Sequence, residues 1–316
     1  MERQGIFGTR VANEGSAPLQ SSPRRADFRW RALPAAFGGE LMSSRVPLAT
    51  IRPQQNWAAL DLRGLWEFRD LFYFLAARDI KVRYKQTVLG ASWAVIQPLF
   101  STLVFSLFFG KLAKMPSDGL PYPVYTYAAM TLWTFLVNAV NSGGNSLVGN
   151  ANLITKVYFP RIIMPAAAVG AGLVDLAIAF VIQLGLNIYY AIPFAGAILM
   201  APVIVLLTTL LASAVGLWMS ALNVKYRDVR FALPFFVQLW MFATPVIYPP
   251  GIVPERYRWL LSLNPMTGLI DGFRSALFNR PFDWSALGIS TAITFAMLIY
   301  ATFSFRKMEM RFADVI

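Results

Sequence analysis

Asp175 is the residue whose position makes the strongest chemical demand, because it is the one acidic residue well inside a predicted membrane span. A charged side chain at that depth costs about 3 kcal/mol on insertion scales, so it should face the protein interior and be protonated or paired. A proton relay would need further titratable partners, and the neighbouring spans offer none. We therefore expect Asp175 to form a hydrogen bond between helices, with a role in a transport pathway as the alternative.

The residue types that the sequence lacks exclude several kinds of chemistry. There is no Cys and no His, which excludes disulfides, thiolate or imidazole metal sites, Cys or His nucleophiles and a Ser-His-Asp triad. The acidic residues beyond position 57 are scattered, so we predict no metal site and no enzyme active site. The sequence has no GxxxxGK[ST] loop either, so energy for work against a gradient would come from a partner protein.

The composition indicates an integral membrane protein. The 316 residues are 57% hydrophobic and 14% charged, whereas a typical soluble domain has about 25% charged residues. Between Asp175 and Lys225 no side chain is charged, and this run is long enough to hold the end of one span, a turn and a complete second span. The net charge of +12 would suggest nucleic acid in a soluble protein. Basic residues also mark the cytoplasmic loops of membrane proteins, so we expect no nucleic acid partner.

Three regions follow one another along the chain. Residues 1–57 form a basic tail rich in Arg, Pro, Ser and Gly, which we expect to be disordered. Residues 58–88 contain an amphipathic pattern with a basic end, which predicts a helix at the cytoplasmic membrane interface; a soluble helix packed on a neighbour is the alternative. Residues 89–316 form an all-α membrane domain. Its uncharged stretches predict six transmembrane helices, at about 91–112, 123–148, 162–190, 197–222, within 231–254 and 284–305.

Lys and Arg in the short loops orient these spans. Basic groups precede the first span, separate spans two and three and spans four and five, and follow span six, so all fall on one side of the membrane. The positive-inside rule places this side, with both chain termini, in the cytoplasm. On the opposite side, residues 248–283 form the longest segment. Its stretch 260–270 is apolar but interrupted by Asn264, Pro265 and Gly268, which favours short re-entrant helices.

Several short motifs, taken in order, resemble one family of membrane proteins. They lie at residues 78–90 with Trp93, and at 156–161, 223–228, 244–248, 264–266 and 312–316. Together they are similar to the permease subunits of ABC transporters that export bacterial surface polysaccharides such as O-antigen, capsule and teichoic acid. The resemblance implies a homodimer of six-span permease subunits in the bacterial inner membrane, bound to two cytoplasmic ABC ATPase subunits. ATP and Mg would bind those partners, with no cofactor in this chain, and a lipid-linked polysaccharide would be the substrate.

A permease driven by a separate ATPase needs rigid cytoplasmic elements that receive the motion of that ATPase. Three basic segments lie on the predicted cytoplasmic side: the amphipathic helix, the loop between spans two and three, and the loop between spans four and five. The alternative is that their charges only anchor these segments at lipid headgroups. The candidate coupling residues are Arg78, Lys81, Arg83, Lys156, Tyr158, Arg161, Lys225, Arg227 and Asp228.

A hydroxyl-rich polymer would need a path through a region where unpaired polar groups are costly. Aromatic faces stack on sugar rings without demanding one pattern of hydroxyls, so we expect the first and fifth spans to line the path and meet across the dimer. The candidate residues are Trp93, Phe100, Phe105, Phe236, Trp240 and Tyr248. Aromatic residues also face lipid and gather at both membrane interfaces, which is the alternative.

The outer segment supplies candidates for the exit of the path. We expect Asn264, Pro265, Asp271 and Arg274 to shape this exit and its re-entrant helices. The spacing of Asp271 and Arg274 also allows a simple surface ion pair, which would contribute little.

Two other functions stay open on the sequence alone. An ABC exporter permease for a drug or a small lipid would have the same broad fold. A membrane-embedded glycosyl or acyl transferase would need an acid or base beside a substrate pocket, which the scattered acids do not supply. Turnover of a lipid-linked sugar without any ATPase would favour the enzyme, and ATP-driven movement of lipid-linked glycans would favour the exporter.

Overall fold

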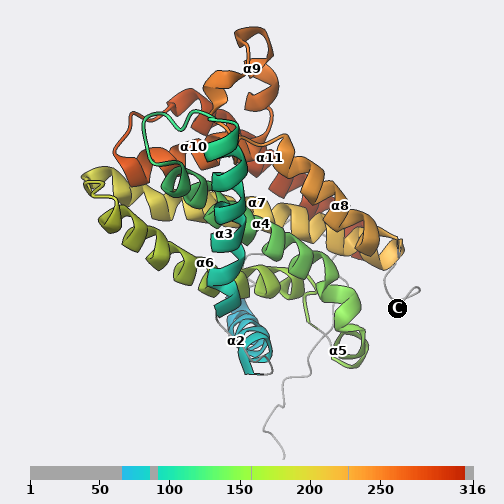
Figure 1. Cartoon of the computed structure of the whole chain (residues 1–316). Coiled ribbons are helices and arrows are strands. Elements are labelled where there is room, and N and C mark those ends of the chain that lie inside the picture. The colour runs from blue at the N-terminus through green and yellow to red at the C-terminus, as the bar shows by residue number, and fades with distance from the viewer. Residues whose placement is uncertain (1–65, 86–91, 158, 227, 310–316) are drawn as a thin grey trace, which may run out of the picture. The chain divides into compact units, whose positions relative to one another are not determined.

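Every regular element in the described part of the chain is a helix (Figure 1). The computed structural model describes residues 66–85, 92–157, 159–226 and 228–309. The predicted tail at 1–57, the beginning of the segment 58–88, and the candidate residues Tyr158 and Arg227 lie outside these described residues. For the part that is described, the all-α fold predicted from the sequence is confirmed.

The long helices coincide with the predicted spans to within a few residues. α3 (Ser92–Phe105) continues directly into a turn of π-helix, η1 (Ser106–Leu112). The other long helices are α4 (Tyr122–Gly149), α6 (Ile163–Tyr189), α7 (Ala201–Lys225), which follows the 3₁₀ turn η2 (Gly196–Met200), and α11 (Trp284–Glu309). The shorter helices are α2 (Arg69–Lys85), α5 (Ala151–Lys156), α8 (Val229–Phe242), η3 (Pro250–Ile252), α9 (Glu255–Ser262) and α10 (Pro265–Phe278).

α4 is the central helix of the bundle. It packs against α3, α6, α7, α8 and α10, and its residues Tyr127 and Leu136 are completely buried. The seam with α7 is close because two glycines face each other: a Cβ on Gly143 would lie 3.4 Å from the Cα of Gly216. Small residues allow this close backbone approach between membrane helices. Larger side chains at these two positions would push α4 and α7 apart.

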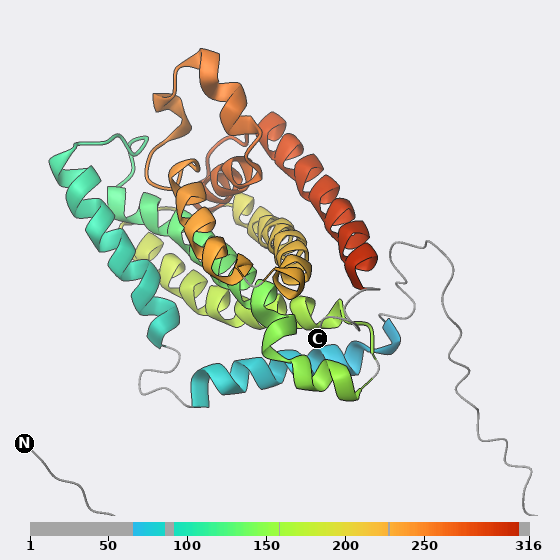
Figure 2. The ribbon, with the colours of Figure 1, turned by 90° about the vertical axis from the view of Figure 1, so that its right-hand side faces the viewer.

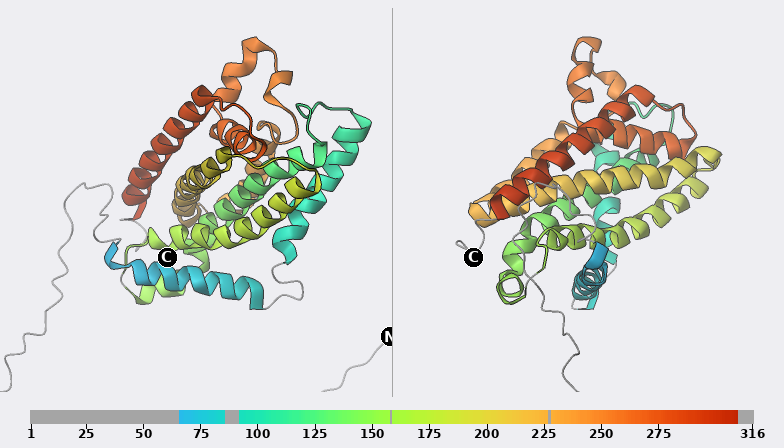
Figure 3. Two further views of the ribbon diagram at one scale, coloured as in Figure 1. Left: turned by 90° about the vertical axis from the view of Figure 1, so that its left-hand side faces the viewer. Right: turned by 180° about the vertical axis from the view of Figure 1, so that it is seen from behind.

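The remaining helices surround this centre. α3 crosses in front of α4 and α6 (Figure 1) and packs against both. Seen from behind, α7 lies between α6 and α11 (Figure 3), and it packs against both of these helices. α2 and α5 lie at one end of the bundle, and α9 lies at the opposite end (Figure 2). Elements predicted to be cytoplasmic and elements predicted to be external therefore lie at opposite ends.

Four helices among the described residues are long and apolar enough to cross a membrane: Ser92–Leu112, Ile163–Tyr189, Gly196–Lys225 and Trp284–Glu309. α4 has 28 residues but is less apolar, since Asn138, Asn141 and Asn145 lie along it. α8 is apolar but has 14 residues, which give about 21 Å of helix against a hydrocarbon core of about 30 Å. The helices thus identify a membrane protein, and the count of six spans stays a prediction.

Two helices occupy the segment where re-entrant helices are predicted. α9 has no buried residue, whereas nearly all of α10 is buried. Asn264 caps the N-terminus of α10, because its Oδ1 accepts a hydrogen bond from the backbone nitrogen of Met266 at 3.1 Å. Pro265 takes the first helical position. An Asn cap followed by Pro is a favoured start for a helix. α10 packs against α4, α7 and α11, and its re-entrant character stays a prediction.

Candidate functional site

α2 is joined to the middle of α6 by two side chains that reach one carboxylate. The guanidinium of Arg83 forms an ion pair with Oδ2 of Asp175, and the hydroxyl of Tyr84 donates a hydrogen bond to Oδ1 of Asp175. The side chain of Asp175 is 15% exposed and that of Arg83 is 32% exposed. The acid inside the third predicted span is therefore paired by residues from α2, which lies outside the predicted spans.

Further contacts hold α2 in this position. Burial and the hydrogen bond to the Asp175 carboxylate raise the pKa of Tyr84 to about 12, so the phenol stays protonated and keeps donating at neutral pH. Leu75 is buried. The ring of Phe72 lies against Gly170 of α6, where a Cβ would come within 3.1 Å of its Cζ atom. α2 is thus seated on α6 by both polar and apolar contacts.

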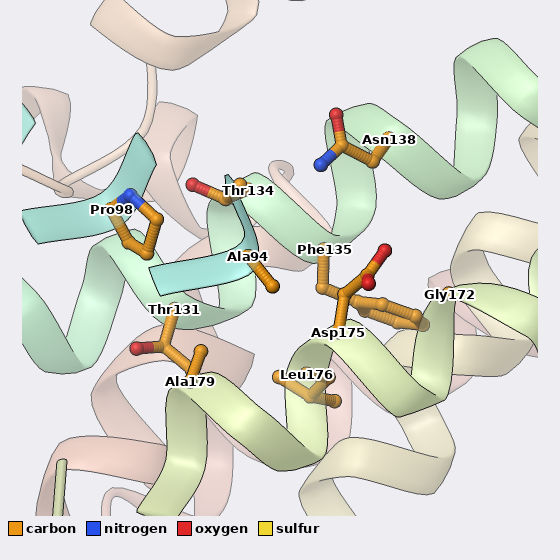
Figure 4. A pocket seen from close by; sticks show the side chains of 10 residues that line it. All are labelled: Ala94, Pro98, Thr131, Thr134, Phe135, Asn138, Gly172, Asp175, Leu176 and Ala179. Carbon is orange, nitrogen blue, oxygen red and sulfur yellow. The ribbon is translucent and has the colours of Figure 1, made fainter. Parts of the chain in front are cut away.

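A small, mainly apolar cavity lies beside Asp175, between α3, α4 and α6 (Figure 4). Its volume is about 20 Å³, and its polar lining comes from Asp175, Thr131, Thr134 and Asn138. A cavity of this size holds about one water molecule. Asp175 thus borders a cavity between helices, and its carboxylate is accommodated at this depth because Arg83 and Tyr84 bind it.

The three candidate coupling residues of α2 have different surroundings. Arg78 pairs with the next residue of its own helix, since its Nη2 lies 2.8 Å from Oδ1 of Asp79. Arg83 is directed to α6, as described above. Lys81 is exposed. Of these three residues, Lys81 is the one whose side chain is most accessible to a partner subunit.

α5 forms a short element between α4 and α6. Ile154 and Phe159 anchor this region in an apolar cluster shared with α2 and α11. Arg161 Nη1 donates a hydrogen bond to the backbone carbonyl of Glu309 at 3.2 Å, which ties the same region to the end of α11. Lys156, the last residue of α5, is exposed. The loop between α4 and α6 is therefore packed firmly against the bundle and still presents one cation to a partner.

The loop between α7 and α8 also leaves its charges exposed. Nζ of Lys225 lies 4.7 Å from the centre of the Tyr226 ring, and both residues are exposed. Asp228 is exposed directly before α8. Tyr158 and Arg227, the two remaining coupling candidates, lie outside the described residues.

Aromatic side chains are exposed on α3 and on α8. Trp93 and Phe100 of α3 and Phe236 of α8 each have more than half of their surface free, at 54%, 65% and 64%. Phe105 is instead partly buried against the core. Both helices pack against α4, so these exposed rings belong to the faces that α4 does not cover. Large apolar side chains that are exposed together in this way mark contact with lipid, with another subunit or with a ligand.

Trp240 and Asn264 connect the end of α8 to the start of α10. Trp240 Nε1 donates to Asn264 Oδ1 at 2.9 Å, and its ring packs edge-to-face on Trp133 with centroids 5.8 Å apart. Asn264 Nδ2 in turn donates to Thr244 Oγ1 at 2.8 Å. Trp240 is a sequence-based candidate for the substrate path and Asn264 is one for the exit of that path. In the structure their side chains are in direct contact. Tyr248, another path candidate, is partly buried.

Arg274 binds the chain that follows α8. Its Nη1 and Nη2 donate to the carbonyls of Pro245 and Val246 at 2.9 and 2.8 Å, and its guanidinium lies 3.6 Å from the centre of the Tyr125 ring. The side chain is 2% exposed. The alternative of a simple surface ion pair with Asp271 is therefore wrong for Arg274, because its guanidinium is buried and is satisfied by carbonyl oxygens.

These hydrogen bonds matter because the residues after α8 leave the helix but stay buried. Thr244, Val246 and Ile247 are buried, and the Tyr122 hydroxyl donates to the carbonyl of Ile247 at 2.7 Å. Non-helical backbone at membrane depth is tolerated only where protein or a wet cavity satisfies its polar groups. The side chains of Arg274 and Tyr122 donate the hydrogen bonds to these carbonyls, although they lie 28 and 125 residues away in the chain.

These features define a helical membrane protein with cations exposed on α2, on α5 and at the end of α7, and its sequence contains no GxxxxGK[ST] motif. Its sequence matches the ABC-2 type transporter family over residues 70–278. The chain belongs to this family and is a membrane subunit of a transporter, which confirms the predicted relationship.

Relatives of this chain cover most of its length. It is 26% identical over 258 residues to the O-antigen export system permease protein RfbA of Myxococcus xanthus, covering 81% of this chain and 98% of that protein. Two proteins of the same name from Klebsiella pneumoniae are 25% identical over 248 residues, covering 78% of this chain and 95% of each relative.

Proposed function

We propose that this chain is the transmembrane subunit of an ATP-driven exporter that moves a lipid-linked polysaccharide across the bacterial inner membrane. The cargo would be of the O-antigen, capsule or teichoic acid type. Two copies of the chain would form a homodimer and bind two ABC ATPase subunits, which hold ATP and Mg. Membership of the ABC-2 type transporter family and the similarity to O-antigen export permeases support this proposal.

The observation that carries the polysaccharide assignment is the exposed aromatic side chains of α3 and α8. Trp93, Phe100 and Phe236 remain uncovered in a subunit whose central helix α4 is mostly buried. In a dimer, two such subunits would bring these rings together around a path. Aromatic faces are suited to a long glycan because they stack on successive sugar rings and leave the hydroxyl groups free to bind water.

In this proposal each subunit crosses the membrane six times, with both termini in the cytoplasm. Four crossings are the long apolar helices, and α4 is long enough to make a fifth while its polar residues face protein. The remaining crossing would combine α8 with the buried residues that follow it. Because Arg274 and Tyr122 satisfy carbonyls of these residues, the chain can cover the distance that the 14 residues of α8 leave.

Coupling to the ATPase would use α2, α5 and the loop after α7. Ile154 of α5 belongs to an apolar cluster that also contains Leu75 of α2 and Phe305 of α11, so a push on α5 would reach these helices through that cluster. The ion pair between Arg83 and Asp175 would pass motion of α2 directly to α6. Lys81, Lys156 and Lys225 are exposed and would contact acidic groups of the ATPase.

Reconstitution tests the transport activity. The subunit and its cognate ATPase would be placed in proteoliposomes with long lipid-linked glycans, a lipid-linked monosaccharide and a small amphipathic drug. The proposal expects ATP-dependent movement of the long glycan. Movement of the drug or of the short lipid alone would instead indicate a drug or small-lipid exporter, and sugar turnover without the ATPase would indicate an enzyme.

Single-cysteine labelling tests the topology, and the chain suits this method because it contains no Cys. The variants Lys156→Cys and Lys307→Cys should react with a membrane-impermeant maleimide only from the cytoplasmic side. Arg256→Cys in α9 should react only from the external side. Labelling of Lys307→Cys from outside would contradict the six-span arrangement.

A further inference from the structure

A second and larger cavity lies away from Asp175, between four helices. It has a volume of about 280 Å³ and opens between the start of α2, the start of α6, the second half of α7 and the second half of α11. We refer to it as the α2–α11 groove. Its walls include Phe72, Ala166, Leu217 and Leu298, and Arg69 lies at its edge.

The walls of the α2–α11 groove are suited to a hydrocarbon chain. Phe72, Leu217 and Leu298 are apolar, and Ala166 leaves space because its side chain is small. Thr302 also lines the groove, but its hydroxyl already donates to the carbonyl of Leu298 at 2.8 Å. Ser213 also lines the groove, but apart from these two hydroxyls and Arg69 the lining is apolar. A ligand in this position therefore needs little polarity of its own. Burial of hydrocarbon in such a groove is favourable because apolar contacts replace an empty volume.

The edge of the groove is suited to an anion. The side chain of Arg69 is 57% exposed, and its ion pair with Asp70 is long, at 3.8 Å, with the Asp70 side chain 90% exposed. A pair this exposed contributes little, so Asp70 does not neutralise Arg69 effectively. The guanidinium also lies 5.6 Å from the centre of the exposed Trp66 ring. Since both of these partners are exposed, Arg69 can still reach a phosphate, which Arg binds through parallel hydrogen bonds.

Other cations lie near the same end of the groove. Arg161 precedes the groove residue Ile162, and Arg306 is one helical turn beyond Thr302. Both arginines lie close enough to Glu309 to interact with its carboxylate, so two cations share one acid there. Glu67 and Asp70 flank Arg69, and the exposed Lys307 follows Arg306. With Glu309, four cations and three acids therefore lie in these segments, and the net charge at this end of the apolar groove is positive by one. Basic pockets between membrane helices are typical binding sites for the headgroups of anionic lipids.

We propose that the α2–α11 groove binds one anionic phospholipid of the leaflet next to α2, with an acyl chain between α2, α6, α7 and α11 and the phosphate on Arg69. This lipid would fill the gap between α2 and α11 and hold α2 against the bundle. The site is separate from the exposed aromatic residues of α3 and α8. The proposal does not depend on which cargo the transporter moves.

Lipid retention by the purified chain tests this site. The protein in mild detergent would be incubated with phosphatidylglycerol or phosphatidylcholine, and bound lipid would be counted by native mass spectrometry. We expect wild-type protein to prefer phosphatidylglycerol. Arg69→Gln, a change at an exposed position, should lower that preference about fivefold, the effect of losing one basic residue near a lipid surface. Ala166→Phe should reduce retention of both lipids because its ring fills the groove.

Controls separate the possible outcomes. Arg256→Gln, at an exposed arginine of α9 at the other end of the bundle, should leave the preference unchanged. Free glycerol phosphate should not raise the thermal unfolding temperature, whereas phosphatidylglycerol should. The proposal is overturned if Arg69→Gln retains phosphatidylglycerol as wild type does, or if Arg256→Gln loses the preference equally. Stronger retention of a polyprenyl phosphate than of phosphatidylglycerol would also overturn it, since the groove would then bind the lipid carrier of a cargo.

Discussion

The guanidinium of Arg83 and the carboxylate of Asp175 form an ion pair that joins α2 to the middle of α6. The two residues are 92 positions apart in the chain. Arg83 lies on a helix with no predicted membrane crossing, whereas Asp175 lies inside one. This pair is therefore a direct polar connection between a segment at the end of the bundle and the interior of the membrane domain.

Removing one member of this pair should destabilise the protein more than removing both. Arg83→Gln removes the ion-pair partner of Asp175, and we expect a loss of about 1–2 kcal/mol, less than for a fully buried pair because both side chains are partly exposed. The double variant Arg83→Gln/Asp175→Asn should recover part of this loss, since two amides can hydrogen-bond. Thermal unfolding in detergent would measure both effects.

The matched control for this cycle is Arg78→Gln, which removes a pair within α2. It should change the free energy of unfolding by less than about 1 kcal/mol. If the effects of Arg83→Gln and Asp175→Asn simply add, within about 0.5 kcal/mol, the two side chains are not energetically coupled and the connection has no role.

The helices could be predicted from sequence because long uncharged runs require them. The ends of α4, α6 and α11 agree closely with the predicted spans. The polar pairs could not be predicted in the same way, because they depend on which helices become neighbours. The sequence did indicate that Arg83 needs a partner, because it lies near the apolar arc of its helix, where an unpaired cation would be costly. Nothing local to Arg274 indicated that it would bind carbonyls beyond α8.

Arg274→Lys should destabilise the protein although it keeps the positive charge. A lysine ammonium cannot reproduce the fork that donates to the carbonyls of Pro245 and Val246, and one buried carbonyl left without a partner costs about 1–3 kcal/mol. Thermal unfolding of the purified variant would measure this loss. Arg280→Lys is the matched control, since Arg280 forms a partly exposed pair with Asp118 at 3.3 Å. An equal effect of both substitutions would count against the carbonyl clamp.

Asp283 should contribute stability that depends on pH. Hydrogen bonds from the Ser285 hydroxyl and the Ala286 backbone nitrogen at the start of α11 lower the pKa of Asp283 below its ordinary value of 3.8. Because the folded-state pKa is the lower one, the contribution is complete above pH 3.8 and is lost as pH falls through the folded-state pKa. Above that pH, Asp283→Ala should cost about 0.5–1 kcal/mol through loss of the cap.

Unfolding of wild type and Asp283→Ala would be measured from about pH 2 to about pH 6, a range that extends below the ordinary pKa of Asp. The difference between the two proteins should shrink toward the acid end. A difference that stays constant over the whole range would mean that the charge of Asp283 is not involved. Asp283→Ser, which keeps a neutral cap, should be close to wild type at low pH.

Lys156→Glu should weaken binding of the ATPase without affecting the fold. Lys156 is exposed at the end of α5, so its replacement removes no contact within the described residues of the subunit. Reversal of one charge at a protein contact should weaken association by about tenfold, which corresponds to about 1.4 kcal/mol. Co-purification with the cognate ATPase at several salt concentrations would measure this. Lys111→Glu, at an exposed lysine of η1 on the predicted external side, is the control and should bind normally.

The exposed aromatic residues of α3 and α8 should affect transport rather than stability. Phe100→Ala and Phe236→Ala remove rings that are 65% and 64% exposed, so the free energy of unfolding should change little. If these rings stack on the cargo, each should lower the rate of glycan export about fivefold, as expected from the loss of about 1 kcal/mol of aromatic contact. The measurement is export in proteoliposomes that contain the cognate ATPase. Phe295→Ala on α11, where the ring is 47% exposed, is the control on a helix outside the proposed path. Normal export by the Phe100 and Phe236 variants together would move the path away from these helices, and an equal loss with Phe295→Ala would point to a general effect of surface aromatics.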